Sequence, residues 1–188
     1  RALYVLALST SPQAHTILVN TAKGGTPDLQ LKAINYLGIN RGREGGKTSS
    51  AELMEIYNAS QNDDVKRAII RAVGSSGDRA ALVNVISGTT VSTLRNEAVN
   101  QLGSAQGQTE LWTLYQRESS KELKMQILST LGSQGAYDRI IDVAKTEKDA
   151  ELRNRASRSL GNMRAERSGA ALGEICGTLS DVADKKAV

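Results

Sequence analysis

The chain has 188 residues, which suffices for one ordinary domain or one extended repeat array. Its 24 lysines and arginines only slightly exceed its 20 acidic residues and form no basic tail, so composition alone does not indicate a nucleic-acid binder. A single histidine and a single cysteine exclude an internal disulfide and disfavour a zinc site. No run approaches the roughly 18 to 20 apolar residues of a membrane span, and many small aliphatic residues favour short packed helices.

The first residues, RALYVLAL, predict a helix that ends near Ser9. The apolar run stops at Leu8 and no small-residue cleavage site follows, so we do not interpret it as a signal peptide. Arg1 stands where later helices carry lysine or arginine, so we expect the chain to begin inside a repeat and to be a fragment of a longer protein. We expect it to be soluble, and both the cytoplasm and the periplasm stay open as its compartment.

Five later segments share one pattern, and each ends in glycine. They are LQLKAINYLG from Leu29, VKRAIIRAVG from Val65, LRNEAVNQLG from Leu94, LKMQILSTLG from Leu123 and LRNRASRSLG from Leu152. The last four glycines, Gly74, Gly103, Gly132 and Gly161, follow one another at intervals of 29 residues, whereas Gly38 precedes Gly74 by 36. Apolar residues recur one, four, five and nine positions before the glycine, which traces one face of an α-helix. The glycine is expected to end the helix in a left-handed conformation.

A second amphipathic helix accompanies each of these segments, as in HTILVNTAK, AELMEIYNA, RAALVNVIS, ELWTLYQR and DRIIDVAKT. A lone pair of such helices cannot bury its apolar faces, but stacked pairs can. We therefore predict an all-α fold of stacked antiparallel helix pairs that forms one array over residues 1–188. Its parts are a partial repeat at 1–9, repeats at about 10–38, 39–74, 75–103, 104–132 and 133–161, and a terminal helix at about 164–180.

The order of an apolar residue, a lysine or arginine, small or aliphatic core residues and a final Leu-Gly resembles the second helix of HEAT repeats, particularly the short bacterial type related to phycobilisome-lyase repeats. The resemblance implies a right-handed α-α superhelix, a HEAT-like solenoid, whose concave surface is lined by the helices with the basic residue. It also implies a structural ladder in which each cation pairs with an acid at the end of the preceding helix. The basic residues of this ladder are Lys66, Arg95, Lys124 and Arg153.

Enzymes built on HEAT-like solenoids are disfavoured by the residues present. One histidine excludes the repeated His-Glu pairs of di-iron hydroxylases, and scarce aromatic residues disfavour bilin lyases and HEAT-like DNA glycosylases. Trp112 shares the phase of Val83 and Ile141, so we interpret it as a core residue. Cys176 lies among apolar residues and His15 has no catalytic partners in the pattern. We expect no catalytic residue, no metal site and no cofactor.

The same glycine-ending helices carry polar residues three and seven positions before the glycine, one helical turn apart on one face. We call this set the polar strip and expect it to bind a protein or peptide segment with acidic character, unless it is merely a solvated face. The leading hypothesis is a non-enzymatic scaffold; a nucleic-acid-binding HEAT-like module and an accessory domain of a lyase-type enzyme are the alternatives. The polar strip comprises Asn35, Arg67, Arg71, Asn96, Asn100, Ser129, Asn154 and Arg158.

The segment GREGGKTSS, residues 42–50, looks like a phosphate-binding loop but lacks the required spacing, because Arg41 stands where the first glycine should be. The seven residues by which this interval exceeds the period fall here, so we interpret the segment as an insertion loop that carries Arg41, Arg43 and Lys47. Ser49 and Glu52 form an S-x-x-E capping box that is expected to start the next helix.

Deletion of the seven extra residues between Gly38 and Ser49 is expected to leave the fold intact, because an insertion between helices contributes no core residue. Far-UV circular dichroism and the thermal unfolding midpoint check this. A large loss of helical signal would show that the segment is part of the folded array. Loss of a bound partner with an unchanged fold would show instead that the loop carries recognition.

Overall fold

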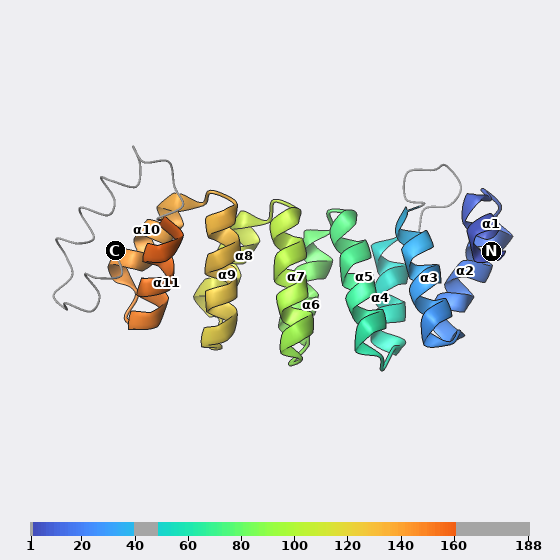
Figure 1. Cartoon of the computed structure of the whole chain (residues 1–188), viewed down its shortest axis with the longest axis horizontal. Coiled ribbons are helices and arrows are strands. Elements are labelled where there is room, and N and C mark those ends of the chain that lie inside the picture. The colour runs from blue at the N-terminus through green and yellow to red at the C-terminus, as the bar shows by residue number, and fades with distance from the viewer. Residues whose placement is uncertain (1, 40–48, 161–188) are drawn as a thin grey trace. The chain divides into compact units, whose positions relative to one another are not determined.

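The computed structural model describes residues 2–39 and 49–160, and within them every regular element is an α-helix (Figure 1). This confirms the predicted all-α class for the described part of the chain. The insertion loop with Arg41, Arg43 and Lys47 lies outside the described residues, as do Gly161 and the terminal helix expected at 164–180 with Cys176. No helix in the described ranges is long and apolar enough to cross a bilayer.

The chain divides into two compact units, Arg1–Ala105 and Gln106–Val188. The described helices of the first unit are α1 (Ala2–Leu8), α2 (Pro12–Gly24), α3 (Pro27–Ile39), α4 (Ser50–Ala59), α5 (Asp63–Ser75), α6 (Arg79–Gly88) and α7 (Ser92–Ser104). Those of the second unit are α8 (Gln108–Arg117), α9 (Lys121–Ser133), α10 (Tyr137–Thr146) and α11 (Ala150–Leu160).

Each unit has two layers of helices (Figure 1). In the first unit α3 packs on α5 and α5 on α7, while α2, α4 and α6 form the other layer and pair with α3, α5 and α7 respectively. In the second unit α9 packs on α11, and α8 and α10 pair with them. The glycine-ending segments of the sequence form α3, α5, α7, α9 and α11. We refer to these five helices as the long helices.

Helix starts follow from side chains that accept hydrogen bonds from free backbone amides. The predicted capping box is confirmed: Ser49 Oγ accepts from Glu52 N at 3.1 Å, and Glu52 Oε2 accepts from Ser49 N at 2.8 Å. Asn62 caps α5 and Asp78 caps α6 in the same manner. These caps fix where each helix begins and therefore which residues face the core.

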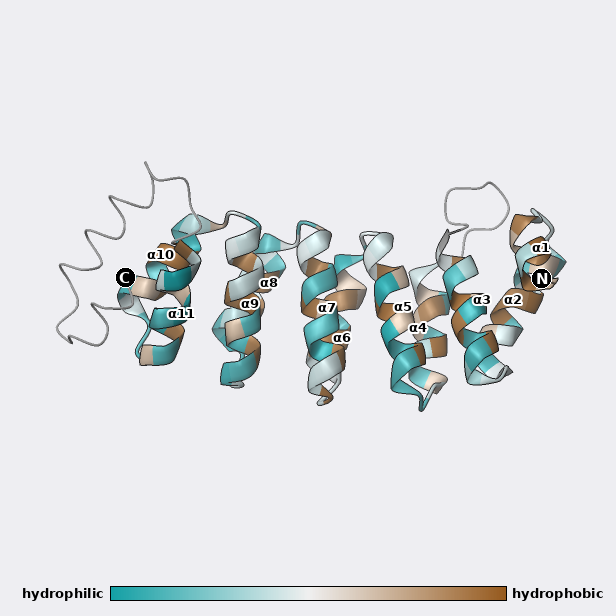
Figure 2. Cartoon of the chain, in the orientation of Figure 1, coloured by the Kyte–Doolittle hydropathy of each residue, from teal (hydrophilic) through white to brown (hydrophobic). Residues whose placement is uncertain are grey.

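The apolar positions predicted from the repeat form the core. In α7, Leu94, Ala98, Val99 and Leu102 are all fully buried at 0% exposure. Figure 2 shows hydrophobic and hydrophilic residues separating to different sides of the same helices. Trp112 is only half-buried, so its interpretation as a core residue is too strong.

The repeated glycines have a different role from the predicted one. Gly74 and Gly132 lie inside α5 and α9, and the left-handed residues come three positions later, at Gly77 and Gly135, both with φ of 73°. A Cβ atom on Gly74 would lie 2.7 Å from Cβ of Gln101 on α7. Because real Cβ atoms do not approach so closely, the glycine permits close packing of neighbouring long helices and does not end the helix.

Leu102→Ala is expected to lower the free energy of unfolding by about 2 to 5 kcal/mol, because it leaves a cavity at a fully buried position. Val91→Ala is the matched control at the start of the same helix, where the side chain is 38% exposed, and should change stability by less than about 0.5 kcal/mol. Urea unfolding of both variants measures the difference. Equal stability of the two variants would contradict the buried position of Leu102.

Candidate functional site

The polar strip projects from the long helices, and its members differ in exposure. The exposed members are Asn35, Arg71, Asn100 and Arg158. The half-buried members are Arg67, Asn96, Ser129 and Asn154. The structure thus places the residues three positions before the glycine mainly outward, and those seven positions before it deeper between the helices.

Arg71 is held by a carboxylate from the next long helix in the first unit. Its Nε donates to Glu97 Oε1 at 3.0 Å and its Nη2 donates to Glu97 Oε2 at 3.1 Å, a bidentate pair. Gln101 Nε2 also donates to Glu97 Oε1, at 3.1 Å. These hydrogen bonds, with Arg71 first, hold the pKa of Glu97 below its ordinary value, and the pair raises the pKa of Arg71. Arg71 is therefore a neutralised cation.

A shallow hollow opens beside Arg71 between α3 and α5. It encloses about 340 Å³ and is lined by Ile34, Asn35, Gly38, Ala68, Arg71, Ala72 and Ser75. Two strip residues, Asn35 and Arg71, thus line one cavity. Small residues on both helices leave room for a side chain from a ligand, while the amide of Asn35 supplies a donor and an acceptor.

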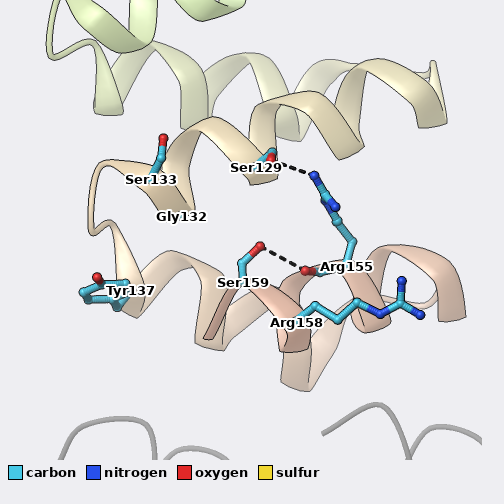
Figure 3. A pocket seen from close by; sticks show the side chains of 7 residues that line it. All are labelled: Ser129, Gly132, Ser133, Tyr137, Arg155, Arg158 and Ser159. Atoms are coloured by element: carbon cyan, nitrogen blue, oxygen red, sulfur yellow. Dashed lines mark hydrogen bonds between the residues drawn. The ribbon is translucent and has the colours of Figure 1, made fainter. Parts of the chain in front are cut away.

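The second unit has a hollow between α9 and α11 of about 430 Å³ (Figure 3). Its lining is Ser129, Gly132, Ser133, Tyr137, Arg155, Arg158 and Ser159. Arg155 reaches across to α9, where its Nη2 donates to Ser129 Oγ at 2.6 Å, and Ser159 Oγ donates to the Arg155 carbonyl at 3.0 Å. None of these lining residues, all from the described part of the chain, is acidic. The two hollows have corresponding strip residues, Asn35 with Arg71 and Ser129 with Arg158.

The basic ladder makes contacts that stabilise helices. Lys66 Nζ lies 5.3 Å from the ring centroid of Tyr57, and Lys124 Nζ lies 4.9 Å from that of Tyr115. Arg95 Nε donates to the Ile86 carbonyl at 2.9 Å. Arg153 Nη1 donates to the carbonyls of Glu147 at 3.0 Å and Lys148 at 2.9 Å. Cations of the ladder therefore bind aromatic faces and helix-end carbonyls as well as carboxylates.

Glu147 joins two helix pairs of the second unit. Its Oε2 accepts from the Tyr115 hydroxyl at 2.7 Å and lies 3.9 Å from Lys124 Nζ. The hydroxyl bond is the largest cause that lowers the pKa of Glu147, and burial together with this carboxylate raises the pKa of Tyr115. Trp112 stacks on Tyr115 with ring centroids 5.5 Å apart, and Arg139 lies over its ring at 5.8 Å. Two neighbours, Tyr115 and Arg139, thus contact the Trp112 ring.

Residues with metal-binding chemistry do not gather in the described part of the chain, where no group of three or more His, Cys, Asp or Glu side chains is placed to hold an ion. His15 Nε2 lies 3.4 Å from Glu52 Oε1, which links α2 to the capping box of α4. Its position is consistent with a structural contact between helices.

The residues that sequence reasoning missed stand six positions before the glycine. Glu97 and Arg155 occupy this position in α7 and α11, and each contacts the residue three before the glycine on the preceding long helix. The positions six and three before the glycine are three residues apart and therefore share a helix face, which the sequence pattern indicates. The contact itself joins two different helices, so it depends on which long helices are neighbours in the fold.

No protein-family model matches the chain, and no curated protein matches its sequence. The polar strip and its two hollows are therefore interpreted from their chemistry.

Glu97→Gln is expected to lower the free energy of unfolding by about 1 kcal/mol at pH 7, because Arg71 loses a charged partner but is itself 60% exposed and screened by solvent. Since the folded-state pKa of Glu97 is lowered, its contribution is present above the ordinary glutamate pKa of about 4.3 and is lost as the pH falls through the folded value. The gap between wild type and variant should therefore close below about pH 4.

Urea unfolding at several pH values measures that gap. Glu55→Gln is the matched control, because Glu55 pairs with Lys23 at 3.1 Å but is 66% exposed, so a smaller change is expected. Equal effects of the two substitutions at neutral pH would contradict the special contribution of the bidentate pair.

Proposed function

We propose that the chain is a HEAT-like helical repeat scaffold without enzymatic activity, and that its polar strip binds an extended protein segment. In support of the repeat architecture, α5, α7, α9 and α11 begin at Asp63, Ser92, Lys121 and Ala150, each 29 residues after the one before. The right-handed superhelix implied by the resemblance is part of this proposal. So is the expectation that the strip lies on a concave surface.

The observation that carries the proposal is the pair of corresponding hollows beside the strip. Each lies between neighbouring long helices, and each combines an arginine with a small polar residue, Arg71 with Asn35 and Arg158 with Ser129. Each hollow has room for one side chain of a bound protein segment. Asparagine, serine and arginine can meanwhile hydrogen-bond its backbone without demanding one sequence.

Charge pairing favours a peptide over a nucleic acid. A polyanion needs free cations in a row, but Arg71 is neutralised by Glu97 and Arg67 lies 3.2 Å from Asp64. These carboxylates would repel phosphates along a strand. Two guanidinium groups that have no carboxylate partner among the described residues, Arg155 and Arg158, line the hollow in the second unit, so we propose that the acidic part of the partner segment binds there.

The double variant Arg71→Ala/Arg158→Ala tests the scaffold proposal. Peptides selected from a random display library on the full chain should be rich in Asp or Glu and should bind the double variant at least about tenfold more weakly, a loss of about 1.4 kcal/mol. Arg117→Ala/Lys148→Ala removes the same charge from exposed residues that line neither hollow and should change affinity less than about twofold.

If the selected peptides bind both double variants with equal affinity, the polar strip is not their binding surface. Binding of an arbitrary DNA duplex with a steep loss of affinity on added salt would favour the nucleic-acid alternative instead. Far-UV circular dichroism of each variant verifies that helicity is unchanged.

A further inference from the structure

The hollow between α9 and α11 differs chemically from the one between α3 and α5. Its lining combines two guanidinium groups, from Arg155 and Arg158, with hydroxyl groups from three serines and Tyr137. The hollow between α3 and α5 has one arginine, which a carboxylate already neutralises, and two alanines. A cavity whose described lining combines cations with hydroxyl groups and includes no acid is suited to an anion.

The charge of this hollow is not balanced by any carboxylate bonded to its arginines within the described part of the chain. Within the described ranges, Arg155 donates to a neutral serine hydroxyl and to no carboxylate, and its Nε is buried without an acceptor. Arg158 is exposed and has no bonded partner among residues 2–39 and 49–160. Asp149 and Glu151, at the start of α11, both pair with Lys121, at 3.0 and 2.5 Å. Among the described residues, the two guanidinium groups of the hollow therefore have no carboxylate partner.

We propose that this hollow binds a phosphate monoester. The donors outnumber what a carboxylate can accept, since a carboxylate has two oxygens in one plane, whereas a phosphate monoester has three terminal oxygens and a charge of about −1.5 to −2 at pH 7. Arg155 is already oriented toward α9 by Ser129, and Arg158 sits one turn away on an exposed helix surface, free to adopt the rotamer that meets the ligand.

The dimensions agree with this class of ligand. A water molecule takes a share of about 30 Å³ in the liquid, so a hollow of about 430 Å³ holds a phosphoryl group together with the side chain that carries it. A Cβ atom at position 132 would lie 3.1 Å from Cβ of Ser159, so the lack of a side chain at Gly132 leaves space between α9 and α11. The two helices thus approach closely at the glycine, while Ser133 and Ser159 donate to carbonyls of their own helices.

Two sources share this chemistry, a phosphorylated side chain and free phosphate. The inference rests on the proposed scaffold function in taking the physiological source to be a phosphorylated serine in the bound segment. Each guanidinium can donate two parallel hydrogen bonds to phosphate oxygens, and the Ser129 hydroxyl, which accepts from Arg155, can donate its own hydrogen to the third.

Isothermal titration of the full chain tests the site with four probes at physiological salt. They are a short end-blocked phosphoserine peptide, its serine and glutamate counterparts, and inorganic phosphate. The phosphoserine peptide is expected to bind at least about tenfold more tightly than the glutamate peptide, and inorganic phosphate should compete with it. Tighter binding of inorganic phosphate than of the peptide would assign the site to the free ion and overturn the phosphorylated segment as its source.

Substitutions inside and outside the hollow distinguish a specific anion site from a general effect of positive charge. Arg158→Ala should weaken phosphoserine binding at least about tenfold, and Arg155→Lys should weaken it several-fold, because lysine keeps the charge but loses the paired donors. Arg117→Ala, at the exposed end of α8, is the matched control and should change affinity less than about twofold. Equal losses for Arg158→Ala and Arg117→Ala would overturn the proposal.

The same data distinguish this inference from the scaffold proposal. Selected peptides that bind along the strip with no preference for phosphoserine, together with no binding of phosphate, would overturn the anion site and leave the scaffold standing. If phosphate and phosphoserine bind in a manner that depends on Arg158 but the display library yields no peptide that binds the strip, the anion site is supported. The scaffold proposal is then wrong. Circular dichroism of Arg155→Lys and Arg158→Ala confirms folding, and the exposed position of Arg158 makes that variant the decisive one.

Discussion

Close approach of neighbouring long helices is the constraint on which the site depends. At Gly74 the side chain of Gln101 occupies the space that a Cβ atom would need, and at Gly132 the side chain of Ser159 does so. Because interiors are packed at crystal-like density, this approach fixes the separation of the two helices and the register between them. The polar residues on either side of each glycine are then held at distances that allow direct contact. The hollows lie beside these contacts.

The register gives the polar strip two roles at once. A residue three positions before the glycine faces outward, but it also meets the residue six positions before the glycine on the next long helix, as Arg71 meets Glu97 and Ser129 meets Arg155. In the first unit this contact neutralises charge, whereas in the second it leaves two guanidinium groups beside neutral hydroxyls. The charge of each hollow therefore depends on what its arginine meets, which is Glu97 of α7 for Arg71 and Ser129 of α9 for Arg155.

Much of the fold could be predicted from the sequence because its signals are local. The apolar positions of α7, Leu94 to Leu102, and the capping box of Ser49 each depend on residues within one helix. The site was predicted less well, because Glu97 and Arg155 matter through contacts between helices. The glycines were assigned to helix ends, since glycine after the last apolar residue is a common stop, but their neighbours on the next helix decide their role.

The contact between Arg71 and Glu97 also bears on how the helices find their correct neighbours during folding. At this contact α5 presents Arg71 to Glu97 of α7, whereas α9 presents Ser129 to Arg155 of α11. A helix with arginine at the Glu97 position, as α11 has with Arg155, would meet Arg71 with like charge, which disfavours the pairing. Chains built from similar units are prone to mistaken assembly between them. Because the side chains at this repeated contact differ between helix pairs, they favour the correct neighbour of each helix over another helix of similar structure.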